Sequence, residues 1–282
     1  MHKRTLAVHD ISCIGRCSLT VALPILSAAG IETSVLPTAV LSTHTGNFEG
    51  YTFRDLTEDI GPICNHWESL GITFESIFTG YLGSFEQIEL VKTIFDKFSC
   101  DDTLIMVDPV MGDNGKLYSN LTEEFPEGFR ELCKKAHVIT PNLTEAAMLL
   151  DIPYRGEGYS EDYIKMLLKK LAELGPEKIV LTGVSFSDSR LGCAVFDKIE
   201  NSTDFVYEEK VEGFYPGTGD VFSSSLLASL MNGLSLSASA AAAVGFTAGA
   251  IRRTCRAGAE SRYGVDFEAG LAEFGLKIKA KK

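Results

Sequence analysis

The chain has no long hydrophobic run. No stretch approaches the roughly 18 consecutive apolar residues that a membrane-spanning helix needs. Its first residues, MHKRTLAVHD, also lack the apolar core of a secretory signal peptide. These absences predict a cytoplasmic protein without a membrane partner.

Cysteine patterns typical of metal sites are missing as well. The seven cysteines are an odd number, and no Cys-x-x-Cys pair or nearby histidine has metal-ligand spacing. Cys13 and Cys17 are the closest pair, and they fall where the first strand is expected to turn into a helix. We therefore expect scattered reduced thiols, as is usual in the cytoplasm.

Basic residues are outnumbered. The chain has 26 lysines and arginines against 38 aspartates and glutamates, which gives a net charge of −12. Such a surface repels phosphate backbones, so nucleic acid and anionic membranes are not expected as partners. If the protein binds a polyanion such as ATP, the attraction must be local, from backbone N–H groups or a bound cation.

Short apolar runs alternate with amphipathic stretches, and this alternation indicates an α/β fold with a doubly wound, mostly parallel sheet. The apolar runs are interpreted as buried strands at Leu6–Val8, Val35–Val40, Ile77–Thr79, Leu104–Val107, His137–Ile139 and Ile179–Thr182. Helical patterns lie between them at Ser18–Ala29, Leu56–Leu70, Phe85–Phe98, Glu123–Lys135, Thr144–Leu150 and Glu161–Leu174. Sheets of this kind bind ligands at the carboxyl ends of their strands.

The last third of the chain has a different pattern. Cys193–Phe196 and Phe205–Val211 are predicted to form a strand pair, followed by a helix from about Asp220 to Asn232. A second helix, Leu236–Arg253, is rich in alanine and glycine, which suggests close helix packing. Because no linker interrupts the chain, we expect a single domain over residues 1–282.

The strongest chemical signal is Gly217-Thr218-Gly219-Asp220 at the start of a predicted helix. Glycines let a ligand approach the backbone, and free N–H groups at a helix N-terminus bind anions. Asp220 is then placed to accept a proton from a substrate hydroxyl during phosphoryl transfer. The alternative is that Asp220 only caps its helix.

The common nucleotide-binding fingerprints are absent. The chain contains no G-x-x-x-x-G-K-[ST], and the glycines near Asp220 do not form G-x-G-x-x-G. Phosphoryl transfer without a P-loop lysine still needs charge neutralisation.

Two strand exits rich in oxygen ligands supply candidates for that neutralisation. Asp108–Asp113 follows one predicted strand, and Thr140–Glu145 follows the next and opens a helix. Together they suit Mg²⁺ held through water and nucleotide phosphates. The alternatives are that Asp113 is a turn residue before Asn-Gly and that Glu145 stabilises its own helix.

These segments resemble the ribokinase-like superfamily in its vitamin-kinase branch. The resemblance rests on GTGD opening a late helix, DPVMGD after a middle strand and ITPNLTEA after the next. The segments Ser42-Thr43-His44-Thr45 and Gly80-Tyr81-Leu82-Gly83-Ser84 resemble F-S-N-H-T and S-G-Y-L-G-S of pyridoxal kinases. The resemblance extends, in the same order of segments, from the first predicted strand to the GTGD helix, and so covers most of the chain.

The resemblance implies a three-layer α/β/α fold around a mostly parallel sheet. It also implies a pyridoxal or pyridoxamine kinase that phosphorylates the 5′-hydroxymethyl group of a B6 vitamer, with ATP and Mg²⁺. The family resemblance suggests a homodimer, and it leaves a monovalent-cation requirement open.

Roles for single residues follow from the same resemblance. Asp220 is the expected base, and Gly217, Thr218 and Gly219 are the expected anion hole. The vitamer is expected beside Asp10, Ser12, Ser42, His44, Thr45 and Tyr81. The nucleotide phosphates are expected beside Asp108, Asn142 and Thr182, with Tyr118 in a loop over ATP. The metal is expected beside Asp113, Thr140 and Glu145. Taken singly, Tyr81 is also readable as a core aromatic and His44 as a turn histidine with satisfied nitrogens.

One position departs from the pyridoxal kinase pattern. Many pyridoxal kinases carry serine after the first strand, in Q-S-H-V, where this chain has Asp10 in His9-Asp10-Ile11-Ser12. A carboxylate there can pair with a protonated ring nitrogen or an amine, which favours pyridoxamine over pyridoxal. Hydroxymethylpyrimidine kinases also carry aspartate near this point, so hydroxymethylpyrimidine is the alternative acceptor. A non-catalytic vitamin-binding protein on the same fold is the alternative from another class. Sugar kinases of the superfamily carry an inserted lid, which we do not find between Ala29 and Tyr51.

Overall fold

A nine-stranded sheet runs through the computed structural model, which describes residues 3–46 and 48–279. The strands of this sheet are β1 (Arg4–Ile14), β2 (Glu32–Thr43), β3 (Phe53–Asp55), β4 (Ser76–Thr79), β5 (Leu104–Val107), β8 (Val138–Ile139), β9 (Lys178–Ser187), β10 (Arg190–Asp197) and β11 (Ser202–Glu209). A separate hairpin pairs β6 (Gly112–Asp113) with β7 (Lys116–Leu117).

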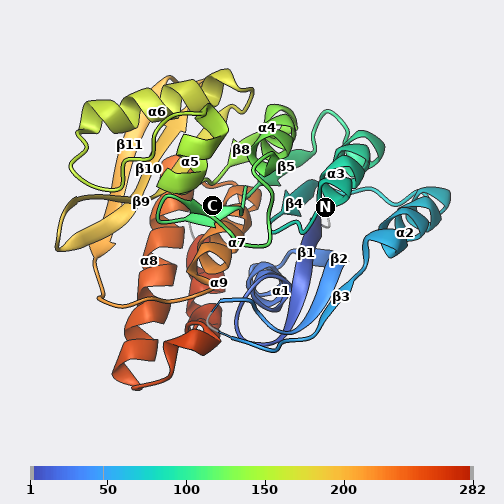
Figure 1. The fold of residues 1–282 in the computed structure, drawn as a ribbon, viewed down its shortest axis with the longest axis horizontal. Helices are drawn as coiled ribbons and strands as arrows, with labels where there is room; N and C mark the ends of the chain where they lie inside the picture. The colour runs from blue at the N-terminus through green and yellow to red at the C-terminus, as the bar shows by residue number, and fades with distance from the viewer. Residues whose placement is uncertain (1–2, 47, 280–282) are drawn as a thin grey trace.

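The helices cover both faces of the sheet (Figure 1). They are α1 (Leu19–Ala28), α2 (Thr57–Ser69), α3 (Phe85–Phe98), α4 (Phe125–Lys135), α5 (Leu143–Leu150), α6 (Glu161–Glu173), α7 (Thr218–Met231), α8 (Leu236–Arg256) and α9 (Leu271–Lys279). Short 3₁₀ turns occur at η1 (Ser261–Tyr263) and η2 (Glu268–Gly270).

The sheet is parallel in its centre and antiparallel at its edges. The strand order is β11-β10-β9-β8-β5-β4-β1-β2-β3, and the strands from β9 to β2 in this order run parallel. Strands β3, β10 and β11 are antiparallel to their neighbours. The predicted three-layer α/β/α fold with a mostly parallel sheet is thereby confirmed.

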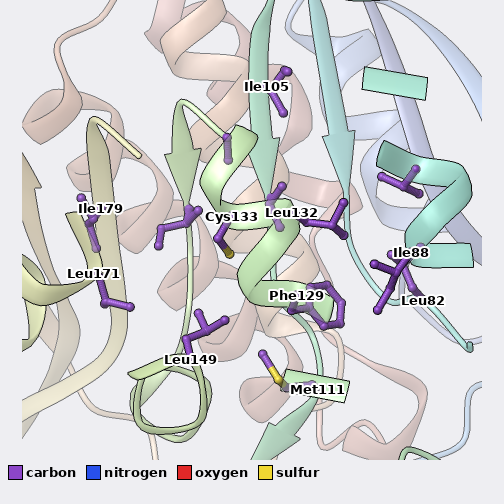
Figure 2. Packing of buried hydrophobic residues seen from close by; sticks show 14 of the residues in the cluster. Leu82, Ile88, Ile105, Met111, Phe129, Leu132, Cys133, Leu149, Leu171 and Ile179 are labelled. Carbon is purple, nitrogen blue, oxygen red and sulfur yellow. The ribbon is translucent and has the colours of Figure 1, made fainter. Parts of the chain in front are cut away.

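Two hydrophobic cores lie on the two faces of the sheet. Helices α2 to α6 pack on one face, where Phe129 and Leu132 of α4, Leu149 of α5 and the sheet residue Ile105 belong to one cluster of buried side chains (Figure 2). Helices α1, α7, α8 and α9 pack on the other face. Strands buried on both sides read as continuous apolar runs, which is why the parallel strands were visible in the sequence.

Several elements were not predicted. Strand β1 continues to Ile14 although His9 and Asp10 are polar, because both side chains are buried between neighbouring strands and helices. The β6–β7 hairpin turns at Asn114 and Gly115, both with positive φ, but each of its strands has only two residues. Strand β3 and helix α9 were also missed. The single domain over residues 1–282 stays a prediction.

Within the described ranges, none of the helices is both long enough and apolar enough to span a bilayer.

Candidate functional site

Helix α7 begins beside a cavity of about 400 Å³ at the carboxyl ends of the central strands. Its N-cap is Gly217, with φ of 77°, and a Cβ atom there would lie 1.9 Å from the Arg16 carbonyl oxygen. Only glycine permits this approach. The N–H groups of Thr218, Gly219 and Asp220 lie in the first turn, where they have no partner within the helix. The cavity therefore has an anion-binding backbone at one wall.

Asp220 is the third residue of α7, not its cap. The N-cap is Gly217 and makes no side-chain hydrogen bond, so the interpretation of Asp220 as a simple cap is wrong. Part of Asp220 faces the cavity, but the surrounding protein withdraws the carboxyl from bulk water. This desolvation raises the pKa of Asp220 to about 7, with a smaller contribution from the charge of Asp10. An acid with such a pKa is suited to accept a proton near neutral pH.

Three carboxyl groups follow one another along the cavity wall. Burial raises the pKa of Asp108 to about 7, and the charge of Asp220 acts in the same direction. Burial also raises the pKa of Glu145 well above its ordinary value, with the charge of Asp108 adding to it. No basic side chain of the described residues is among the groups that shift these three pKa values. These three carboxyl groups therefore favour their protonated forms unless a cation binds nearby.

Glu145 ties two loops together. Its Oε2 accepts a hydrogen bond from Asn142 N at 2.8 Å, and its Oε1 accepts one from Met111 N at 3.2 Å. Asn142 in turn caps α5 by accepting from the N–H groups of Thr144 and Glu145, and donates through Nδ2 to Gly112 O. Glu145 thus stabilises its own helix, as the alternative proposed, while both it and Asn142 line the cavity.

The remaining metal candidates, Asp113 and Thr140, differ in their exposure to solvent. Asp113 is exposed in the β6–β7 turn, where its carboxylate accepts from Asn114 N and Nδ2. It is therefore a turn residue that also lines the cavity. The buried Thr140 hydroxyl makes no well-formed hydrogen bond to the described residues, although it lies close enough to Asp108 to lower the pKa of that carboxyl.

The donor set fits a cation that arrives with the nucleotide. No group of three or more His, Cys, Asp or Glu side chains in the described ranges could enclose a metal. The oxygen-only donors of Asp108, Asp113 and Glu145 at one cavity nevertheless match Mg²⁺, which keeps several waters and binds through few carboxylates plus phosphates.

The far end of the cavity was not found by sequence reasoning. Thr182 and Tyr118 line it as expected. Residues of α8 and of the segment after β11 also line it and were not predicted; they include the apolar Phe214, Val244 and Ile251 and the polar Lys210 and Thr247. The alanine-rich composition of α8 indicated only close packing, and no spacing in the sequence marked this face.

The expected acceptor side of the site is organised around Asp10. Its Oδ1 accepts a hydrogen bond from Ser18 Oγ at 2.5 Å, and its Oδ2 accepts one from Ser12 Oγ at 3.5 Å. Burial raises the pKa of Asp10, which these hydroxyl groups oppose. Ser18 also acts on Asp220 through its backbone N–H, so it links the two carboxyl groups. Ser18 has a left-handed φ of 53°, a feature the sequence did not signal.

His44 and Tyr81 lie near Asp10, since each interacts with it electrostatically. Both nitrogens of His44 are engaged by backbone, with Arg262 O at 2.6 Å and Gly46 N at 3.1 Å. The alternative interpretation of His44 as a turn histidine with satisfied nitrogens is therefore correct for both ring nitrogens. A vitamer can contact only the carbon edges or the face of the ring. The Tyr81 hydroxyl accepts a hydrogen bond from Asn120 Nδ2.

Two expected acceptor residues are placed differently. The Ser42 hydroxyl accepts a hydrogen bond from Thr52 N at 2.8 Å across the β2–β3 pair, so its partner is a backbone group of the same sheet edge. Thr45 is exposed. Their expected contact with a vitamer stays a prediction.

Comparisons with known proteins identify related kinases. The family profile described as phosphomethylpyrimidine kinase matches residues 63–264. A crystal structure of a candidate phosphomethylpyrimidine kinase from Bacteroides thetaiotaomicron, in a form with pyridoxal, is 40% identical, with a TM-score of 0.92 over 97% of this chain and 96% of that chain. Pyridoxal kinase from Lactobacillus plantarum is 28% identical, with a TM-score of 0.90 over 99% and 98% of the two chains.

A curated relative extends the comparison. Pyridoxal kinase from Dictyostelium discoideum is 27% identical over 242 residues, which are 80% of this chain and 78% of that protein. In a further relative, from Schizosaccharomyces pombe, the match covers only 58% of its length.

The tight contact at Gly217 generates a stability prediction. We expect Gly217→Ala to lower the free energy of unfolding by at least about 1–2 kcal/mol, because a Cβ there is strained by positive φ and overlaps Arg16. Gly219→Ala is the matched control, because its Cβ would meet nothing within 4 Å. Urea unfolding measures both variants. Equal stability of the two would contradict the packing described for Gly217.

The raised pKa of Asp108 generates a pH prediction. Between about pH 4 and pH 7 this acid is protonated in the folded protein but ionised in the unfolded chain, so the folded state binds more protons and loses stability as pH rises. Asp108→Asn removes this loss. Without nucleotide, we expect its stability relative to the native protein to increase by about 1–4 kcal/mol from pH 4 to pH 8. A pH-independent difference in urea unfolding would refute the raised pKa.

Proposed function

Because the chain belongs to the phosphomethylpyrimidine kinase family, we propose that it transfers the γ-phosphoryl group of ATP to the 5′-hydroxymethyl group of a B6 vitamer. Its resemblance to the pyridoxal kinases of the ribokinase-like superfamily, first suggested by short motifs, is confirmed by the family match and by the similarity to pyridoxal kinases in sequence and structure. The protein is therefore a kinase, and the relative crystallised with pyridoxal supports a B6 vitamer as the acceptor.

One observation carries the proposal. Asp220 lies in the first turn of α7, between free backbone N–H groups and the row of Asp108 and Glu145, in a cavity large enough for a nucleotide phosphate chain. A general base thus stands beside an anion-binding backbone. Both are needed when a hydroxyl oxygen attacks a phosphoryl group.

In the proposed reaction, Asp220 accepts the proton of the 5′-hydroxyl as its oxygen attacks the γ-phosphorus. The new P–O bond forms while the bond to the bridging oxygen of ADP breaks, and ADP leaves with that oxygen. In this proposal the N–H groups of Gly217, Thr218 and Gly219 stabilise negative charge on the transferring oxygens, which is supported by the free first-turn position of the last two. Asp10 and Tyr81 orient the acceptor, and Asn142, Thr182 and Tyr118 line the nucleotide side.

Mg²⁺ belongs to the proposal as a companion of ATP. Asp108, Asp113, Thr140 and Glu145 would hold it together with water and phosphates, where it neutralises phosphate charge. The buried acids would then return to their ionised forms, because a nearby cation lowers the pKa of a carboxyl group.

The oligomeric state and the compartment are further parts of the proposal. We propose a homodimer, as the family resemblance suggested, and a cytoplasmic location, where free thiols such as the seven of this chain are usual. The requirement for a monovalent cation stays open.

Hydroxymethylpyrimidine is the second candidate acceptor, because the matching family is described by phosphomethylpyrimidine chemistry. It requires the same transfer to a hydroxymethyl group, so the machinery around Asp220 would be unchanged. A non-catalytic vitamin-binding protein is less well supported, because a binder has no need of an acid beside an anion site.

The role of Asp220 generates a kinetic prediction. We expect Asp220→Asn to lower kcat with pyridoxal by about 10²–10⁴-fold, because the amide cannot accept the proton. ADP release measures kcat, and Asp102→Asn, in an exposed turn, is the matched control. Near-native turnover by a correctly folded Asp220→Asn protein would remove Asp220 from the role of base.

The position of Asp10 generates a specificity prediction. If its carboxylate pairs with the amine of pyridoxamine, Asp10→Ser should lower the pyridoxamine to pyridoxal ratio of kcat/KM by roughly 10–100-fold, the worth of one charge-assisted hydrogen bond. Asp10→Asn is the control that keeps the shape and removes the charge. An unchanged ratio in Asp10→Ser would exclude the pairing.

A further inference from the structure

The connection between α8 and α9 carries none of the motifs that identified the site, yet it contacts both loops that border the expected acceptor pocket. We define residues 260–268 as the C-terminal strap. The strap is anchored on α8 and contacts Arg16 and His44.

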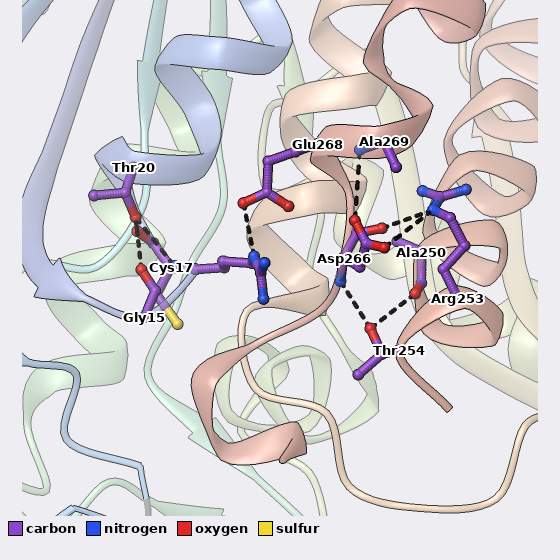
Figure 3. A network of polar contacts seen from close by, with 10 residues as sticks. Gly15, Cys17, Thr20, Ala250, Arg253, Thr254, Asp266, Glu268 and Ala269 are labelled. Carbon is purple, nitrogen blue, oxygen red and sulfur yellow. Dashed lines mark hydrogen bonds and ion pairs between the residues drawn. The ribbon is translucent and has the colours of Figure 1, made fainter. Parts of the chain in front are cut away.

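The strap is anchored at Asp266. The Asp266 N–H donates to Thr254 Oγ1 at 2.7 Å, and its carbonyl oxygen accepts from Arg253 Nε at 2.9 Å. Thr254 is buried near the end of α8 and donates to Ala250 O, so the anchor continues into the helix (Figure 3). One end of the strap is therefore fixed to α8.

Arg16 is held between the strap and α7. Its N–H donates to Tyr263 O at 3.0 Å, and its Nε pairs with Glu268 Oε1 at 2.7 Å. Figure 3 shows Glu268 extending toward the Gly15–Cys17 segment. A Cβ at Gly264 would lie 2.6 Å from Arg16 Cβ and 2.9 Å from Arg16 O, so the two segments are in direct contact. Because Arg16 O also packs on Gly217, the strap supports the N-terminus of α7 through a single intervening residue.

The strap also accepts a hydrogen bond from His44. Since Nδ1 accepts a hydrogen bond from Gly46 N at 3.1 Å, that nitrogen carries no hydrogen. The hydrogen of the neutral ring is then on Nε2, which donates to Arg262 O at 2.6 Å. A Cβ at Gly15 would lie 2.8 Å from His44 Cδ2, so the ring is also fixed from the side.

A cation–π contact closes the strap onto the loop after β2. The guanidinium of Arg262 lies 5.5 Å from the ring centre of Phe48 and 5.0 Å from that of Tyr263. Phe48 meets the edge of His44 at 4.9 Å between ring centres. Arg262 therefore contacts His44 through its backbone and the neighbouring aromatic residues through its side chain.

We propose that the C-terminal strap is a positioning element of the acceptor site, which fixes the orientation of the His44 ring through the Arg262 carbonyl and seats Arg16 against α7. The assignment of the acceptor side rests on the proposed function. None of residues 260–268 is among the described residues that line the nucleotide cavity. Disturbing the strap should therefore raise KM for the vitamer more than KM for ATP.

Two glycines of the same connection provide a matched pair of variants. Gly264 and Gly258 both have positive φ, of 89° and 59°, so alanine is strained at either position. Only at Gly264 does the added Cβ meet Arg16, while at Gly258 nothing lies within 4 Å. We expect Gly264→Ala to raise KM for pyridoxal about tenfold, which corresponds to about 1.4 kcal/mol. Gly258→Ala should change it by less than about twofold.

Arg262 provides a second test that leaves the backbone intact. Arg262→Ala removes the cation–π contact and should raise KM for pyridoxal by roughly 2–5-fold, and Arg262→Lys should restore most of the loss. This pair keeps the proposal testable if Gly264→Ala does not fold.

A spectroscopic measurement separates this proposal from the proposed function. Imidazole ¹H–¹⁵N spectra should show a hydrogen-bonded, downfield-shifted Nε2–H of His44 in the native protein and in Gly258→Ala, with that signature lost in Gly264→Ala; His44→Gln assigns the signal. The same Nε2–H signature in all three proteins, or equal KM values for pyridoxal in the two glycine variants, overturns the strap proposal. A native protein with no turnover on any vitamer would instead overturn the proposed function, while the spectra still decide the role of the strap.

Discussion

The contact between Gly217 and the Arg16 carbonyl is the constraint on which the site depends. It brings the start of α7 against the loop after β1, and so places Asp220 near Asp10 and the free N–H groups of α7 at the cavity. A side chain at residue 217 would push these two elements apart. The strap contacts Arg16 from the other side, so a short stretch of backbone links α7 to the strap and to the proposed acceptor side.

A pocket that binds anions is expected to be lined by basic side chains, but acidic side chains prevail in this one. The cavity lining includes Lys210, but it also has three carboxyl groups whose burial raises their pKa values. The N-terminus of α7 adds attraction for phosphate, because its backbone dipoles supply partial positive charge. The acids are suited to a cation that accompanies the nucleotide, which explains how a chain of net charge −12 can bind a polyanion.

The sequence predicted the parallel strands and the three loop motifs because buried runs and strand-exit polar residues leave strong local patterns. It did not predict contacts between distant segments. Nothing near Ser18 indicated that it would link Asp10 to Asp220, and nothing near Arg262 indicated a contact with His44. The short β6–β7 hairpin and α9 were missed because their few residues gain order from packing against the rest of the fold. The expectation for Asp220 as base stays a prediction, although its position excludes a capping role.

The most direct test of the account is to follow ADP release and product formation together, with Mg·ATP and pyridoxal, and with hydroxymethylpyrimidine in parallel. The account predicts one phosphorylated pyridoxal for each ADP, at a higher kcat/KM than with the pyrimidine. Turnover on the pyrimidine alone would reassign the acceptor. Binding of pyridoxal with no ADP released would contradict the central claim that this cavity is the active site of a vitamer kinase.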